Sequence, residues 1–82
     1  MVKTIVQWYG LEYPPEAHIS EYADGTFVAL DSMSGGYPYA TSLSRAKLWA
    51  TAHEAMEYAA LFPKEGFELR TITIIAEEVN PS

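Results

Sequence analysis

Prolines and glycines interrupt the 82-residue sequence so often that only one segment is well suited to a helix. Thr51 and Glu54 have the spacing of a capping box, and Pro63 stops the pattern that follows. We therefore expect a helix from Ala52 to about Phe62. Its apolar side chains form one stripe, which consists of Ala52, Ala55, Met56, Ala59 and Phe62. Because there is one helix, strands must supply the rest of the core.

Two segments in the first half of the chain have the composition of strands. Residues 2–9 are rich in β-branched and aromatic residues, and Gly10 is expected to end this strand. Residues 17–31 are predicted to form a hairpin, because residues 18–22 alternate, Asp24-Gly25 is a typical tight-turn pair, and residues 27–30 resume the strand.

The second half begins with an irregular stretch. Residues 31–42 contain two adjacent glycines and a proline, and long ordered loops of this kind are often functional. Residues 43–49 fit either a short strand or an extra helical turn. Residues 64–66 are expected to form a turn before a final strand at residues 67–76. The apolar positions of that strand slip by one residue, which predicts a bulge or a strand covered on both faces.

This order of elements predicts an α+β fold. We expect a mainly antiparallel sheet of about four strands with one helix packed on one face, in the order β-β-β-α-β. Residues 1–82 are expected to form a single domain whose last residues, 79–82, are a frayed tail. The chain has no cysteine, which excludes disulfides and thiolate metal sites. It shows no signal peptide and no apolar stretch of membrane-spanning length, so we expect a cytoplasmic protein.

Charge is distributed unevenly along the chain. The sequence has 11 acidic and 5 basic residues, a formal net charge of −6, yet residues 4–44 contain no lysine or arginine. This acidic segment also holds Tyr9, Tyr13, Tyr22, Tyr37 and Tyr39. Tyrosines beside adaptable Ser and Gly residues are typical of a binding surface, and acidic residues would attract a basic partner. The plainer interpretation, which stays open, is that these tyrosines belong to the core or its rim and that the acids keep the protein in solution.

We predict that seven residues of this acidic segment contact a partner. They are Glu12, Glu16, Glu21, Asp24, Asp31, Tyr37 and Tyr39.

Patterns that would indicate catalysis are weak. His53 and Glu57 are one helical turn apart, but a metal site would need a further ligand such as His18. Ser32 or Ser34 could be combined with His53 and Asp31 into a Ser-His-Asp triad, but the sequence lacks the Gly-x-Ser-x-Gly turn of serine hydrolases. The two glycines at residues 35–36 lack the lysine and Ser/Thr of a phosphate loop. We therefore predict no catalytic, cofactor-binding or metal-binding residue, and a protein that is not an enzyme.

Residues 46–59 read Ala-Lys-Leu-Trp-Ala-Thr-Ala-His-Glu-Ala-Met-Glu-Tyr-Ala. This order of an aromatic residue, a Ser/Thr, Glu-Ala and Tyr-Ala on a short helix resembles a pattern in small phage and prophage proteins of unknown function. Small acidic phage proteins include anti-defence inhibitors such as anti-CRISPR proteins, some of which occupy the basic groove of a nuclease. The resemblance implies a similar role here, and it implies no catalytic residue.

The leading hypothesis is a non-enzymatic, phage-type accessory protein or anti-defence inhibitor. It would block a basic, nucleic-acid-binding surface on a larger protein or ribonucleoprotein, without itself contacting nucleic acid or a membrane, because its few basic residues are scattered. An alternative is a housekeeping or structural module that acts as a homo-oligomer, suggested by the two-sided final strand and by Leu61 among polar helix residues. A third is an enzyme or small-ligand protein that uses residues 31–42 and His53.

Overall fold

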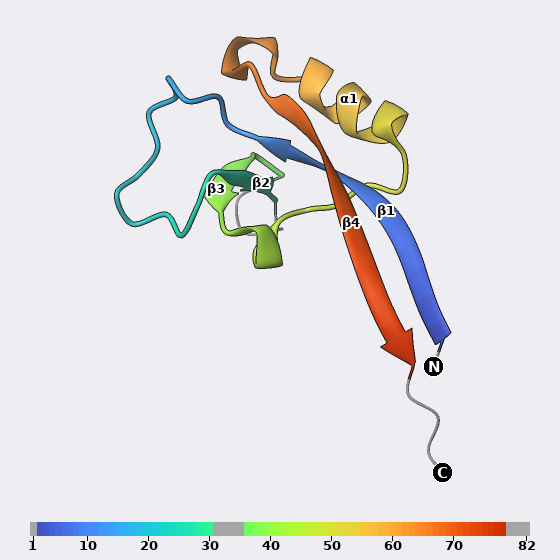
Figure 1. Cartoon of the computed structure of the whole chain (residues 1–82). Helices are drawn as coiled ribbons and strands as arrows, with labels where there is room; N and C mark the ends of the chain where they lie inside the picture. Colours follow the sequence, from blue (N-terminus) through green and yellow to red (C-terminus); the bar gives the residue numbers. More distant parts are fainter. Residues whose placement is uncertain (1, 31–35, 79–82) are drawn as a thin grey trace.

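The computed structural model describes residues 2–30 and 36–78. Its sheet has the strand order β3-β2-β1-β4, every pair is antiparallel, and one helix packs against it (Figure 1). The helix and strands are β1 (Val2–Glu12), β2 (Phe27–Ala29), β3 (Tyr39–Thr41), α1 (Ala52–Ala60) and β4 (Glu68–Glu78). The predicted α+β fold and its β-β-β-α-β order are confirmed. Within the described ranges, no helix is long and apolar enough to span a membrane.

The longest element is the ribbon formed by β1 and β4. Its two strands pair without interruption from Val2↔Glu78 to Glu12↔Glu68. The predicted bulge in the final strand is therefore wrong. Instead, the apolar residues of β4 change faces: Leu69 lies on the side that α1 covers, whereas Ile72 and Ile74 lie on the opposite side.

Gly10 does not end the first strand, so that prediction is also wrong. β1 continues through Gly10 to Glu12, and the glycine is buried. A Cβ atom at this position would lie 3.3 Å from Cδ2 of Leu48 and 3.8 Å from Cγ1 of Ile72. The glycine therefore allows the segment before α1 to pass close over the ribbon.

The predicted hairpin at residues 17–31 is wrong as well. Residues 18–22 form no strand, and β2 pairs with β3, from Phe27↔Thr41 to Ala29↔Tyr39. β3 therefore lies in the stretch that was predicted to be irregular. Gly25 is not needed for a hairpin turn here: a Cβ atom on it would lie 2.8 Å from the carbonyl oxygen of Thr41, so glycine permits this close approach.

The start of α1 agrees with the sequence prediction. The Thr51 Oγ1 atom accepts a hydrogen bond of 3.1 Å from the backbone N–H of Glu54. The predicted apolar stripe is partly wrong, because Met56 is 48% exposed and Tyr58 instead packs on Trp49, with 5.5 Å between ring centroids.

The segments that flank α1 agree in part with the predictions. Residues 43–49, for which either a short strand or a helical turn was expected, contain a 3-10 turn at Leu43–Arg45 and a single β-bridge between Trp49 and Tyr9. The predicted turn after the helix is present as a second 3-10 turn, Pro63–Glu65, which ends at Gly66 with a φ of 65°.

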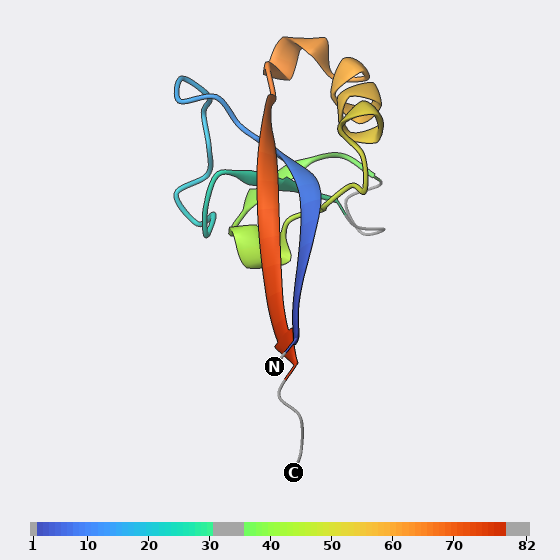
Figure 2. The same ribbon diagram turned by 45° about the vertical axis from the view of Figure 1, so that its right-hand side comes forward.

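The core lies where α1 and β2 meet the inner half of the ribbon. Leu11, Val28 and Ala55 are fully buried at its centre. Half-buried side chains surround them: Tyr9, Tyr13, Leu30, Trp49, Tyr58, Ala59, Phe67 and Leu69. The outer half of the ribbon projects beyond the helix and β2, as the two views show (Figures 1 and 2).

Candidate binding groove

The loop of residues 13–26 connects β1 to β2 and carries three of the seven predicted contacts, Glu16, Glu21 and Asp24. Backbone hydrogen bonds give it a defined shape without strands. The N–H of Tyr13 donates to the carbonyl of Thr26 across the base of the loop at 2.8 Å. Ala17 donates to Pro14, and Ala23 donates to Ser20, each at 3.0 Å, which makes two turns within the loop.

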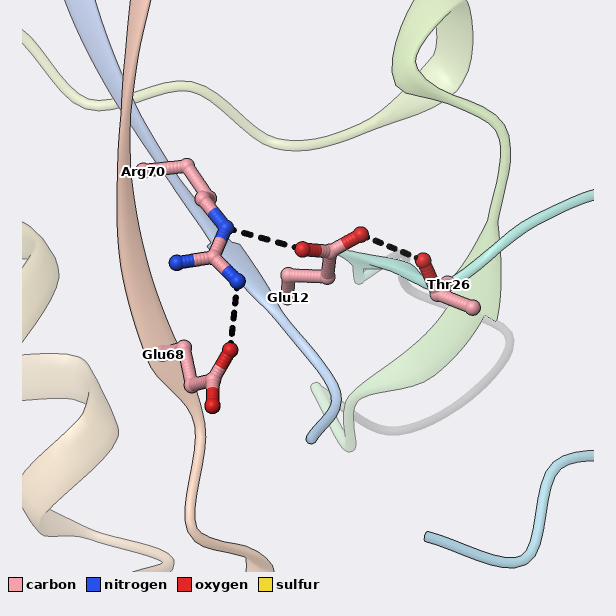
Figure 3. A network of polar contacts seen from close by, with 4 residues as sticks. All are labelled: Glu12, Thr26, Glu68 and Arg70. Atoms are coloured by element: carbon pink, nitrogen blue, oxygen red, sulfur yellow. Dashed lines mark hydrogen bonds and ion pairs between the residues drawn. The ribbon is translucent and has the colours of Figure 1, made fainter. Parts of the chain in front are cut away.

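A polar network fastens the base of this loop to β4 (Figure 3). The Thr26 hydroxyl donates to Oε2 of Glu12 at 2.6 Å, and the Arg70 Nε–H donates to Oε1 of the same carboxylate at 2.8 Å. Arg70 also pairs with Glu68. The Thr26 and Arg70 hydrogen bonds lower the pKa of Glu12, because both stabilise the ionised carboxylate.

Glu12 therefore has a structural position that its sequence context did not indicate. Its side chain is only 22% exposed, and each carboxylate oxygen already accepts a hydrogen bond. Glu12 therefore belongs to the polar network of the fold and not to the contact surface.

An open groove lies between the loop, β3 and the turn after α1. It is lined by Tyr13, His18, Ile19, Ser20, Tyr22, Ala23, Tyr39, Ala40 and Glu65, and we call it the tyrosine groove. Tyr13 packs edge-to-face on Phe67, with ring centroids 5.0 Å apart. Burial raises the pKa of Tyr13, whereas Tyr22 is 87% exposed. The groove thus has one fixed aromatic wall and one aromatic side chain that a partner can reach.

Acidic side chains surround the tyrosine groove. Glu65 lines it directly, and Glu16 lines an adjoining hollow together with His18 and Lys64. Glu21 lies between two lining residues of the loop. Among the residues that the structure describes, Glu16 and Glu21 are exposed and form no ion pair. Their charges are therefore available to an incoming partner.

The structure separates the remaining predicted contacts. Tyr39 lines the groove, whereas the ring of Tyr37 lies 6.0 Å from that of Phe62 at the end of α1. Asp24 is exposed and lies 3.6 Å from Arg45, which compensates part of its charge. Asp31 lies outside the described residues. The seven predicted residues thus do not form one continuous site.

Of the residues that line the groove, only Tyr39 was among the predicted contacts, and the absent ones include His18, Tyr22 and Glu65. His18 and Tyr22 belong to the stretch that alternates like a strand, and this pattern concealed a loop. Glu65 lies more than 40 residues further along the chain, and only the tertiary structure brings it to this loop. No local signal in the sequence links it to Tyr22.

The groove offers phenol, imidazole and carboxylate groups, which suit hydrogen bonding and aromatic contact with a protein surface. Across residues 2–30 and 36–78 there is no cluster of three potential metal ligands. His53 lies on the exposed face of α1, where its Nε2 is 2.8 Å from Oε1 of Glu57, and it does not line this groove. Ser32 and Ser34 fall outside the described residues.

No family model, curated protein or solved structure matches this chain. Its function must therefore be inferred from the groove and the charge distribution themselves.

Proposed function

We propose that the protein is a non-enzymatic binding module that docks the tyrosine groove and its acidic rim onto a basic surface of a larger protein or ribonucleoprotein. The observation that carries this proposal is an exposed Tyr22 in a groove near Glu16 and Glu21, two exposed carboxylates that form no ion pair among the described residues. Tyrosine supplies contact area at a low cost in side-chain entropy. The carboxylates supply attraction over about 8–10 Å at physiological salt.

Such a surface would compete with nucleic acid for a basic groove, since both present negative charge and flat rings. This is the role of an anti-defence inhibitor, and the phage-like pattern at residues 46–59 is consistent with it. Direct binding to nucleic acid is disfavoured, because a protein with a net charge of −6 repels phosphate.

Two double variants with the same change in net charge test this proposal. Glu16→Lys/Glu21→Lys reverses the rim of the groove, whereas Glu54→Lys/Glu57→Lys reverses two exposed carboxylates on α1. Wild-type protein is first used to isolate the partner from host lysate, and the purified partner is then bound to each variant between about 50 and 300 mM salt. Circular dichroism establishes that each variant is folded.

We expect the rim variant to associate at least about tenfold more slowly at low salt and to lose most of its salt dependence. The α1 variant should retain the salt dependence of the wild type. Equal effects of the two variants would mean that net charge, and not the groove, determines the association rate. No effect of either variant would refute the electrostatic proposal.

A Tyr22→Ala variant tests the aromatic part separately. Because Tyr22 is 87% exposed, its removal should leave stability unchanged but accelerate dissociation from the purified partner. An unchanged dissociation rate would place the contact away from the groove.

A further inference from the structure

The outer half of the ribbon exposes apolar side chains on both faces. We call residues 4–8 of β1 and 72–76 of β4 the arm. Ile5 and Ile75, which pair across the strands on one face, are 64% and 60% exposed. Val6 and Ile74 pair on the other face and are 39% and 42% exposed. β-branched residues at such exposure lose the burial that normally favours them in strands.

The described part of the chain covers only the base of this arm: Trp8 and Ile72 are half-buried, whereas Ile5, Val6, Ile74 and Ile75 stay exposed. β1 meets β2 only at Glu12↔Phe27, and its bridge to Trp49 is at Tyr9, so both edges of the arm lack a neighbouring strand. A two-stranded ribbon is at best marginally stable in water unless its apolar side chains pack against something. We propose that a second copy of the chain covers the arm, so that the protein forms a symmetric dimer through it.

Charge favours a second copy as the occupant. In a symmetric dimer the same surface meets itself, so like charges would face one another. The arm has no charged residue, although the chain as a whole has a net charge of −6. The acidic loop of residues 13–26 lies at the other end of the molecule from the tip of the arm (Figures 1 and 2). Contact between two arms therefore keeps the acidic loops of residues 13–26 in the two copies apart.

The available area indicates how the arms must meet. An extended chain exposes roughly 160 Å² per residue, so ten residues that are half covered by ribbon pairing retain roughly 800 Å² per copy. A stable interface buries about 600–1,000 Å² on each partner. One face of the arm supplies only about half of the arm's exposed area, which is less than a stable interface needs. The dimer therefore requires both faces to be covered, either by interlocked arms or by an arm that lies along the partner's ribbon.

The test is the oligomeric state of the full chain in solution. Sedimentation velocity from about 1 to 500 µM covers the range of moderate self-association. We expect the wild type to reach twice the monomer mass of 9.1 kDa. Hydrogen exchange of the arm amides should slow over the same concentration range, while exchange in α1 stays constant.

Val6→Lys/Ile74→Glu is the disrupting variant. The two new charges attract each other across the ribbon, which preserves strand pairing, but they place ions in the contact between copies. Met56→Lys/Leu61→Glu is the matched control, because these residues are 48% and 70% exposed on the helix side. The arm variant should be monomeric at every concentration, and the control should dimerise like the wild type.

A wild type that stays monomeric at the highest concentration, or that assembles without limit, would overturn the proposal. So would an arm variant that still dimerises. A monomeric control beside a dimeric arm variant would assign the contact to the helix side instead. None of these outcomes depends on the tyrosine groove, so this proposal and the proposed function can fail separately.

Discussion

The inner and outer halves of the β1–β4 ribbon have the same pairing but different surroundings. At the inner half, Leu11 is fully buried beneath α1 and β2. At the outer half, Ile5 on the same strand is 64% exposed. The outer half, residues 4–8 and 72–76, is the richer of the two in residues that favour strands, so local propensity does not explain why the inner half is the buried one. What differs is whether another element packs on the ribbon, and this determines which half stabilises the monomer.

The largest expected effect is therefore a loss of stability when the inner half is truncated. Leu11→Ala should reduce the free energy of unfolding by about 2–5 kcal/mol, because it leaves a cavity in a core with few fully buried side chains. Ile5→Ala should cost less than about 1 kcal/mol in dilute protein. Urea unfolding at low protein concentration measures both. Similar losses would mean that the outer half is already covered in the monomer.

Protein concentration sharpens the same comparison. If a second copy covers the arm, the cost of Ile5→Ala should rise with protein concentration, because dimerisation stabilises the folded state. The cost of Leu11→Ala should not rise in this way.

A smaller effect on stability is expected from the N-cap of α1, the helix that packs on the inner half of the ribbon. Thr51→Ala removes the acceptor for the Glu54 N–H and should cost about 1 kcal/mol. Thr51→Ser retains a hydroxyl and should preserve most of that stability. Thermal unfolding of the two variants measures the difference, and equal losses would show that the hydrogen bond is not what the threonine contributes.

The smallest effect should come from the polar network at the base of the loop. The pKa of Glu12 is lowered in the folded protein, so its contribution is fully present above the unfolded-state pKa of about 4.3 and is lost as the pH falls through the folded-state pKa. Glu12→Gln should therefore destabilise the protein at neutral pH and flatten its stability curve below about pH 4.5. Glu16→Gln is the matched control for loss of a carboxylate, and urea unfolding at several pH values should show little flattening for it.

The sequence predicted features that depend on neighbouring residues. The Thr51 cap, the helix between Thr51 and Pro63 and the turn that ends at Gly66 all agree with the structure, since each rests on contacts within a few positions of the chain. The expected hairpin failed because the alternation of residues 18–22 and the Asp24-Gly25 pair are also compatible with a packed loop. The close approach of Gly25 to Thr41 is a tertiary requirement that the local pattern does not reveal.

The candidate site was predictable only in outline. The segment without lysine or arginine is a property of the sequence, and it contains Glu16, Glu21, Tyr22 and Tyr39, which the structure places in or beside one groove. The sequence did not distinguish the exposed Tyr22 from Tyr13, which packs on Phe67. It also did not predict that Arg70 would donate a hydrogen bond to the Glu12 carboxylate.

By itself the sequence determined the α+β class, the helix, the two long strands and the acidic half of the chain, because propensity, capping and charge are local properties. Only the tertiary structure decided that β2 pairs with β3, which tyrosines line the groove and which half of the ribbon is buried. These outcomes depend on contacts between residues far apart in the chain, whose energies are set by mutual packing rather than by neighbouring residues.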